Sequence, residues 1–123
     1  MPDHTLKKEE RLHGKNDIAT LLAKGRYGDE HFIRYRYIKD SDSGRNRMMV
    51  SVSKRFFKRA VKRNLLKRRI RESYRLMKHL LPEKGGIDIL FIYNTNEVRT
   101  FADISEAMER ILKKISGHGQ KQA

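Results

Sequence analysis

The sequence predicts an α+β fold, a single-domain α/β sandwich in which a small, mostly antiparallel sheet of about four strands packs with a long central helix and flanking N- and C-terminal helices. Three observations predict it. Short runs of β-branched and aromatic residues have the length of strands, residues 57–81 contain no Gly or Pro, and residues 101–115 carry apolar residues at helical spacing. The length of 123 residues fits one compact domain, and no internal repeat indicates a second.

The N-terminal part is predicted to contain one short helix. Residues 1–15 are polar and lack periodicity, so we expect a mobile or loosely docked arm there. The next apolar residues, Ile18, Leu21 and Leu22, fall at helical spacing. Because Gly commonly follows the last turn of a helix, Gly25 marks the expected end.

Two strands are expected next. Phe32–Ile38 is rich in β-branched and aromatic residues with alternating arginines, which indicates a strand with one wetter face. Residues 40–47 (DSDSGRNR) have turn composition, and Met48–Val52 reads as a second strand. The short connection favours an antiparallel hairpin between the two strands.

A long helix and a buried strand follow. The run from Phe57 to Leu81 consists of good helix formers and ends at Pro82 and the Gly85-Gly86 pair. The nearly continuous apolar run Ile87–Tyr93 has strand length, so we expect a strand inside the sheet.

The last predicted element is an amphipathic helix over residues 101–115. Its acids come early and its lysines late, as the helix dipole favours. The expected buried stripe consists of Phe101, Ile104, Met108, Ile111, Leu112 and Ile115. The small, polar tail 116–123 is expected to be disordered.

Charge points to a polyanionic partner. The formal net charge is +14 and the isoelectric point about 10.3. Twelve Lys or Arg and one acid, Glu72, lie between Lys54 and Lys78, a local net charge of +11 that leaves only +3 for the rest of the chain. A protein made basic for solubility alone would scatter its charge, so the concentration indicates one nucleic-acid-binding element.

The long helix separates apolar from cationic side chains. At about 100° per residue, one side gathers Leu66, Ile70, Ser73, Met77 and Leu81, which are expected to pack on the sheet. A different side, which we call the basic face, gathers Asn64, Lys67, Arg68, Arg71, Arg75 and Lys78. The alternative is an ordinary solvated face, but a face with five cations and no acid cannot be stabilised by ion pairs among its own members.

Other chemistry finds little support in the residues. Without cysteine there is no disulfide or thiolate metal site, and a reducing compartment such as the cytoplasm is favoured. The five histidines form no ligand-spaced pair, and we expect no metal held by the protein. Asp88, in an otherwise apolar strand, is either a functional carboxylate or, more ordinarily, a strand-end residue that faces solvent or a basic neighbour. No catalytic motif stands out, no apolar stretch approaches the roughly 20 residues of a membrane span, and the start lacks a secretory signal.

The string SVSKRFFKRAVKRNLLKRRIRESYR, residues 51–75, resembles the signature of the bacterial ribonuclease P protein component. In that family a Ser-Val-Ser-Lys strand end leads to a helix with an Arg-Asn motif and a Lys-Arg-x-x-Arg-Glu block. The likeness covers roughly residues 6–115. It implies the ribosomal protein S5 domain 2-like fold with a left-handed βαβ crossover.

The resemblance also implies a division of labour. The catalytic RNA would carry the Mg²⁺-dependent removal of the 5′ leader from precursor tRNA, with Mg²⁺ held mainly by RNA. The protein would have no catalytic residues and would bind both RNAs. The RNA-binding residues implied are Lys54, Arg55, Arg59, Lys62, Arg63, Asn64, Lys67, Arg68, Arg71 and Arg75. The leader cleft implied consists of Ile18, Leu22, Phe32, Tyr35, Ser51 and Ser53.

Two positions depart from the family pattern. Leu65 stands where a third motif Arg is common, so one cationic contact is either absent or supplied by Arg69. Ile18 and Leu22 stand where the family often has aromatics, and they can pack but cannot stack on a base. The alternatives are a ribosomal or other structural RNA-binding protein, and a DNA-binding module. No membrane or stable protein partner is expected.

Overall fold

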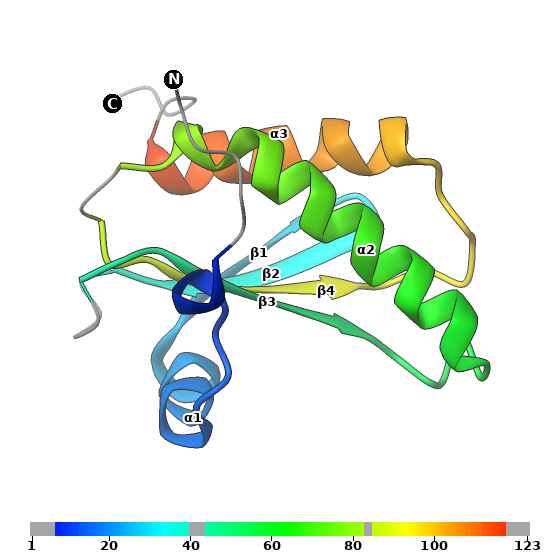
Figure 1. The fold of residues 1–123 in the computed structure, drawn as a ribbon, viewed down its shortest axis with the longest axis horizontal. Helices are drawn as coiled ribbons and strands as arrows, with labels where there is room; N and C mark the ends of the chain where they lie inside the picture. The colour runs from blue at the N-terminus through cyan, green and yellow to red at the C-terminus, as the bar shows by residue number, and fades with distance from the viewer. Residues whose placement is uncertain (1–6, 40–43, 83–84, 118–123) are drawn as a thin grey trace.

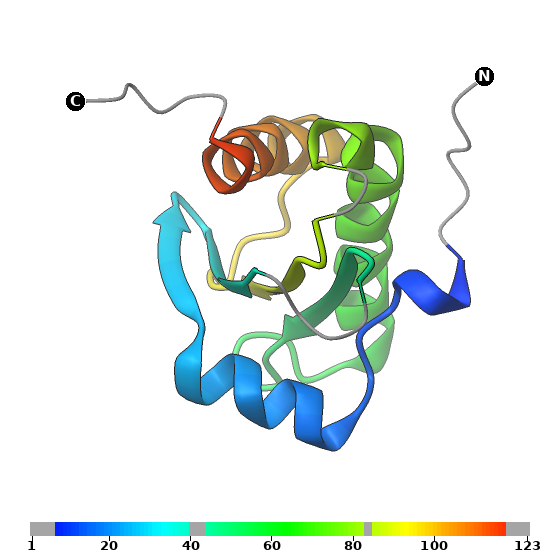
Figure 2. The ribbon, with the colours of Figure 1, turned by 90° about the vertical axis from the view of Figure 1, so that its left-hand side faces the viewer.

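The computed structural model describes residues 7–39, 44–82 and 85–117. Its elements are η1 (Lys8–Glu10), α1 (Lys15–Lys24), β1 (Arg26–Glu30), β2 (Ile33–Ile38), β3 (Arg47–Val52), α2 (Ala60–Met77), η2 (Lys78–Leu80), β4 (Asp88–Tyr93) and α3 (Phe101–Ser116). The sheet lies between α1 on one face and the α2–α3 pair on the other (Figures 1 and 2). The α+β class with one mixed, mostly antiparallel four-stranded sheet is confirmed.

The strand order corrects one prediction. The order is β1-β2-β4-β3, with β2 antiparallel to both neighbours and β3 parallel to β4. The expected hairpin between β2 and β3 is therefore wrong, because β4 lies between them. Parallel strands need a long crossover connection, and α2 supplies it between β3 and β4.

The strand on the other side of β2 is β1, which pairs with it antiparallel and was not predicted. Its sequence, RYGDE, has little β-propensity and no apolar alternation. Gly28 explains part of the pairing, because a Cβ added there would lie 2.5 Å from the hydroxyl of Tyr35 on the opposite strand. The strand forms because β2 offers a free edge directly across a tight turn at His31, whose φ is +56°.

The core lies on both faces of β4, as its apolar sequence predicted. Ile89, Phe91 and Tyr93 belong to the large cluster under α2 and α3. Leu90 belongs to a smaller cluster with Leu21 of α1. The sheet face toward α1 is thus covered only in part, whereas the opposite face is covered by two helices.

The two C-terminal helices follow their predicted patterns. In α2, Leu66, Ile70 and Ser73 are fully buried, although the helix is shorter than the expected run 57–81 and is followed by η2. In α3 the predicted stripe is buried except for Phe101, which is 39% exposed. Thr100 caps α3 by accepting a hydrogen bond from the backbone of Asp103. Disorder was predicted for residues 116–123, but Ser116 belongs to α3 and Gly117 caps the helix; residues 118–123 lie outside the described residues.

The segment before α1 is docked, which is the second of the two alternatives, mobile or loosely docked, expected for residues 1–15. Leu12 is buried, and its backbone N–H donates to the carbonyl of Met48 at 2.8 Å. Lys78 Nζ donates to both carboxylate oxygens of Glu10 at 2.9 Å. Only residues 7–15 of the expected arm are described.

Candidate nucleic-acid interface

The basic face of α2 lines a hollow on the surface. Asn64, Arg68, Arg71, Glu72 and Arg75 form it together with Arg11 from the docked N-terminal segment, around a volume of about 500 Å³. The spacing of three and four residues along α2 places these side chains on one side of the helix, away from its buried stripe. The cationic side chains predicted to share a face are therefore brought together at the surface.

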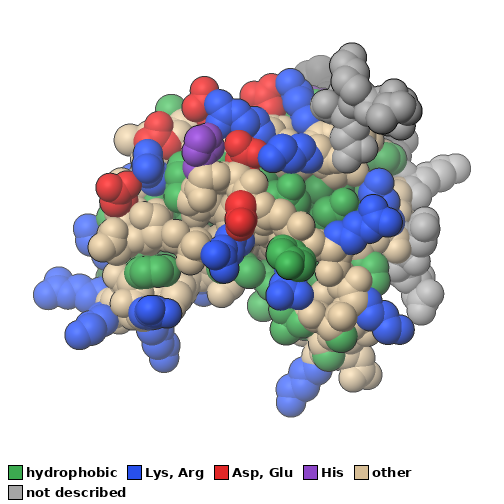
Figure 3. Space-filling model, turned by 180° about the vertical axis from the view of Figure 1, so that it is seen from behind, with side chains coloured by type: hydrophobic (Ala, Val, Ile, Leu, Met, Phe, Trp, Pro, Cys, Tyr) green, Lys and Arg blue, Asp and Glu red, His purple; other side chains and the backbone are tan. Residues whose placement is uncertain are grey.

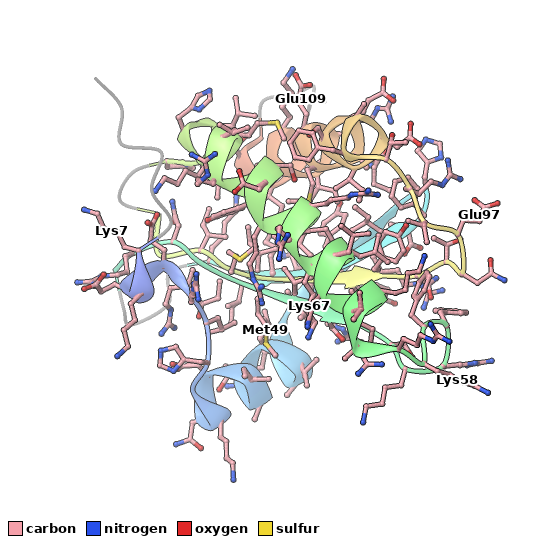
Figure 4. All side chains as sticks on the ribbon, turned by 45° about the vertical axis from the view of Figure 1, so that its right-hand side comes forward. Lys7, Met49, Lys58, Lys67, Glu97 and Glu109 are labelled. Carbon is pink, nitrogen blue, oxygen red and sulfur yellow. The ribbon has the colours of Figure 1, made fainter. Side chains whose placement is uncertain are left out.

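A second hollow continues the first toward β3 and the segment before α1. It also has a volume of about 500 Å³ and is lined by Arg11 and Arg71 as well, so the two hollows share a border. Its floor includes Met49 of β3, and Lys67 of α2 lies beside it. Figure 4 shows Met49 and Lys67 close together where α2 crosses β3 above α1. The result is a groove between α2 and the N-terminal segment that opens toward the α1 side of the sheet.

The centre of the basic face is not neutralised. Among the described residues, no carboxylate lies within ion-pair distance of Lys67, Arg68 or Arg71. Burial lowers the pKa of the Arg71 guanidinium, and the positive charge of Arg11 lowers it further. Repulsion between these cations is relieved when an anion enters the groove.

The C-terminal end of the basic face differs from the prediction of an acid-free surface. Arg75 pairs with Glu72 at 2.7 Å. Lys78 is engaged by Glu10 and holds the N-terminal segment in place. The uncompensated part of the face is therefore the stretch from Lys67 to Arg71, together with Arg11.

The other residues that the resemblance implies for RNA binding lie in the loop before α2 and in its first turns. Lys54, Arg55, Arg59 and Lys62 are exposed there. Arg63 is half-buried, and its Nη1 donates to the carbonyls of Phe57 and Lys58 at 2.8 Å. Arg63 thus fixes the loop that leads into α2 and has less freedom to reach a ligand than its neighbours.

Arg69 does not replace the cation missing at Leu65. It lies on the side of α2 that faces the start of α3, where its guanidinium donates to the carbonyl of Arg99. A side chain committed to that contact cannot reach the basic face. The sequence left the third cation of the motif either absent or supplied by Arg69, and the structure supports its absence.

The leader-cleft residues do not share one surface. Ile18 packs on the small cluster on the α1 side, and Leu22 is 47% exposed on the same helix. Ser51 alternates with the buried Val50 and Val52 and so faces the α1 side too. Ser53 lies just beyond β3, where its Oγ accepts a hydrogen bond from the backbone of Arg55.

Phe32 and Tyr35 lie in the core on the α2–α3 side of the sheet, which corrects their assignment to a cleft beside α1. Phe32 packs edge-on against Tyr93, and the guanidinium of Arg99 lies 4.7 Å from its ring centroid. Tyr35 is 6% exposed, and burial raises the pKa of its hydroxyl. The alternation along β2 instead turns Arg34 and Arg36 toward α1.

Sequence reasoning missed Arg11 and the arginines of β2 as candidate ligands. Arg11 lay in a segment without periodicity, so nothing indicated its docking beside α2. Arg34 and Arg36 were seen as a wetter strand face, but the pattern could not say that this face flanks α1. Figure 3, which views the molecule from behind, shows acidic side chains mixed with Lys and Arg in the upper part, where α3 runs, and Lys and Arg without acids along the lower edge.

Asp88 has a structural partner. It is buried, and Arg47 donates to its two oxygens at 2.9 and 2.7 Å while also contacting Asp17 of α1 at 3.1 Å. The pair therefore ties α1 to the central strands. Among the described residues, no group of three or more His, Asp or Glu side chains could hold a metal ion, and no helix has the length and apolarity to cross a membrane.

Comparisons with known proteins agree with this architecture. The family model described as Ribonuclease P matches residues 6–116. A ribonuclease P protein component from Porphyromonas gingivalis is 36% identical over 120 residues, which cover 92% of this chain and 88% of that protein. The RNase P protein structure from Staphylococcus aureus has a TM-score of 0.74 at 25% identity and covers 86% of this chain and 94% of its own. The one from Thermotoga maritima has a TM-score of 0.73 at 26% identity, with coverages of 85% and 96%.

Proposed function

Because the chain belongs to the ribonuclease P protein family, we propose that it is the protein subunit of a ribonucleoprotein that removes the 5′ leader from precursor tRNA. It binds the catalytic RNA and the leader and so assists an endonucleolytic reaction. The observation that carries the proposal is the groove in which Arg11, Lys67, Arg68 and Arg71 have no carboxylate partner among the described residues.

In this proposal the RNA subunit carries the chemistry. The protein supplies no catalytic residue, and Mg²⁺ in the holoenzyme is held mainly by RNA. The protein lowers the repulsion between two polyanions, since each phosphate it neutralises releases counterions and reduces the cost of bringing the RNAs together. An uncompensated cationic groove suits this task, because its charge is available for phosphates.

The basic face contacts the catalytic RNA, and the sheet face beside α1 contacts the leader. Lys67, Arg68 and Arg71 bind the catalytic RNA together with the exposed cations at the start of α2. The leader lies on the α1 side of the sheet, near Ile18, Leu22 and Ser51. The buried positions of Phe32 and Tyr35 take no part. The complex is cytoplasmic and needs no membrane or further protein partner.

Reconstitution tests the proposal. Cleavage of precursor tRNA by the catalytic RNA of the same organism is measured at low Mg²⁺, with and without the protein, where electrostatic repulsion limits the reaction most. Stimulation by the protein, lost when Mg²⁺ is raised, is expected. A protein that binds RNA without stimulating cleavage would instead be a structural RNA-binding protein, and one whose binding is competed best by duplex DNA would be a DNA-binding module.

A further inference from the structure

Tyr27 on β1 is an aromatic residue left in solvent. Its exposed fraction is 76%, whereas Tyr35, Tyr74 and Tyr93 are buried. β1 forms one edge of the sheet, and its pairing with β2 places Tyr27 directly across from Arg36. An exposed aromatic ring is costly to hydrate, and covering it with another flat group is favourable.

Arg36 holds the ring in a defined position. Its guanidinium carbon lies 5.3 Å from the centroid of the Tyr27 ring, a cation–π contact. The same guanidinium donates to the carbonyl of Leu22, the exposed residue near the end of α1, at 2.9 Å. Contacts with β1 and with α1 therefore fix the Arg36 side chain. The Tyr27 ring packed against it is ordered before any ligand arrives.

The surroundings favour an anionic ligand. Lys24, at the end of α1, lies three residues before Tyr27 and is exposed, whereas Arg26 alternates to the other face of the sheet. Arg34, with 61% of its side chain exposed, follows on the same face of β2 and pairs with Asp29, the nearest acid on β1. Glu30 alternates to the other face, where it is buried under α3. The face around Tyr27 is thus positively charged on balance.

Tyr27 lies in the same row of residues across the sheet as Met49, which lines the groove beside α2. The strand register aligns Tyr27 with Arg36, Leu90 and Met49, and Met49 lies beside Lys67 in the groove described above. Three interstrand gaps of about 4.8 Å separate the two ends, roughly 14 Å in all. Leu90, in the middle of this row, is buried against Leu21 of α1, so a single strand of RNA that leaves the basic face reaches β1 around α1 and not along the sheet surface.

We propose that Tyr27, braced by Arg36, is a stacking platform for an unpaired base of the precursor-tRNA leader. The proposal rests on the proposed function. It also compensates for a feature of this chain, since Ile18 and Leu22 of α1 cannot stack. The ring binds the base by its π-face and is therefore tolerant of base identity, and the cations on the same face, Arg34 and Arg36, attract the leader phosphates.

Leader length separates this platform from a structural role. Binding by the reconstituted holoenzyme is measured for precursor tRNAs that carry a leader of one nucleotide or of about eight. Y27A is expected to weaken binding of the long-leader precursor by on the order of tenfold, the loss typical of one stacked base. The short-leader precursor should bind as before, and Y27F, which keeps the ring, should retain native affinity for both.

Phe101 provides the matched control. It is an aromatic residue exposed by 39% at the start of α3, on the other side of the sheet. F101A removes a ring of similar size, and we expect it to leave the dependence on leader length unchanged. Thermal unfolding of Y27A and F101A shows whether either variant has lost its fold.

Fluorescence quenching detects base stacking directly and complements the affinity measurements. A fluorescent purine analogue placed at successive leader positions should be quenched at one or two of them, and Y27A should restore its emission. Equal affinity losses for both leaders, or none, together with unchanged quenching, would overturn the platform. If the native protein fails to stimulate cleavage at all, the proposed function fails. If it stimulates and Y27A behaves as native, only the platform fails.

Discussion

α2 and α3 lie side by side over the same face of the sheet, but they treat their charges differently (Figure 1). On α3, Lys113 pairs with Glu109 at 2.9 Å and Arg110 lies 3.7 Å from Glu106. On α2, Lys67, Arg68 and Arg71 have no carboxylate within reach among the described residues. A helix face neutralised by its own acids needs no partner, whereas one left uncompensated carries repulsion that an anionic ligand relieves.

The largest expected effect is the loss of RNA affinity when cations are removed from α2, compared with the loss when the same number is removed from α3. Replacing Arg68 and Arg71 with Ala is expected to weaken binding of the catalytic RNA by about a hundredfold, with about 1.5 kcal/mol for each lost charge-assisted contact. The slope of log affinity against log salt should also fall by about 1.4 to 1.8, because two phosphates lose their partners. Filter binding over a salt series measures both.

The matched control removes the same charge from α3. The double variant R110A/K113A should change RNA affinity by less than about threefold, because exposed paired charges contribute little. If both double variants lose affinity equally, RNA recognition depends on total charge and the contrast between the helices is wrong. Circular dichroism should show both variants folded, since none of the four side chains belongs to the core.

Arg11 extends the uncompensated surface beyond α2. Replacing it with Ala is expected to weaken RNA binding about tenfold, the loss of one charge-assisted contact. Replacing the neighbouring Lys7, which is exposed and outside the groove, is the control. An R11A variant with native affinity would confine the binding surface to α2.

Glu30 of β1 neutralises a cation of α3, which adds to the difference in charge pairing between α3 and α2. Its buried carboxylate accepts a hydrogen bond from Lys114 at 2.6 Å, and this bond raises the pKa of the Lys114 ammonium. We expect E30Q to lower the free energy of unfolding at pH 7 by about 1 kcal/mol, a modest loss because Lys114 is half exposed and screened by solvent. Urea unfolding measures it.

The pH dependence of this pair has a definite sign. A raised cation pKa means that the folded state holds the proton more tightly, so the stabilisation is complete below the ordinary lysine pKa of 10.5. It is lost as pH rises through the higher pKa of the folded state. The stability gap between the native protein and E30Q should therefore narrow above about pH 10.5, and a constant gap would contradict the pairing.

The smallest effect is expected at Tyr74, on the buried side of α2. Its ring packs against Phe91, and its hydroxyl has no hydrogen-bond partner within the described part of the chain. Replacing Tyr74 with Phe should leave stability at pH 7 unchanged or raise it by up to about 1 kcal/mol, because an unsatisfied polar atom is removed. A loss of more than this in urea unfolding would show that the hydroxyl has a partner.

The Tyr74 hydroxyl also makes the stability of the fold depend on pH in the alkaline range. Burial raises the pKa of its hydroxyl, so the folded state keeps the neutral phenol. This contribution to stability is complete below the ordinary tyrosine pKa of 10.0 and is lost as pH rises above it, where the unfolded chain ionises first. The stability of Y74F should therefore decline less steeply above pH 10 than that of the native protein.

Much of the molecule could be predicted from local pattern. The buried stripe of α2, the apolar run of β4 and the stripe of α3 each carry a periodicity that only one packing satisfies. The concentration of cations between residues 54 and 78 likewise indicated the element that carries the basic face. Partnerships between distant segments could not be predicted in this way, and the errors lie there: the β2–β3 hairpin, the missing β1, and Phe32 and Tyr35 assigned to a cleft.

The amino-acid order by itself determined which residues are helical, which are apolar and where positive charge accumulates, because these depend on neighbours within a few positions. The tertiary structure alone decided that β4 enters between β2 and β3, that Arg11 reaches α2, and that Tyr27 and Arg36 lie on the open side of the sheet. Strand order and face depend on which long-range pairing buries the most apolar surface, and that choice is made by the whole chain at once.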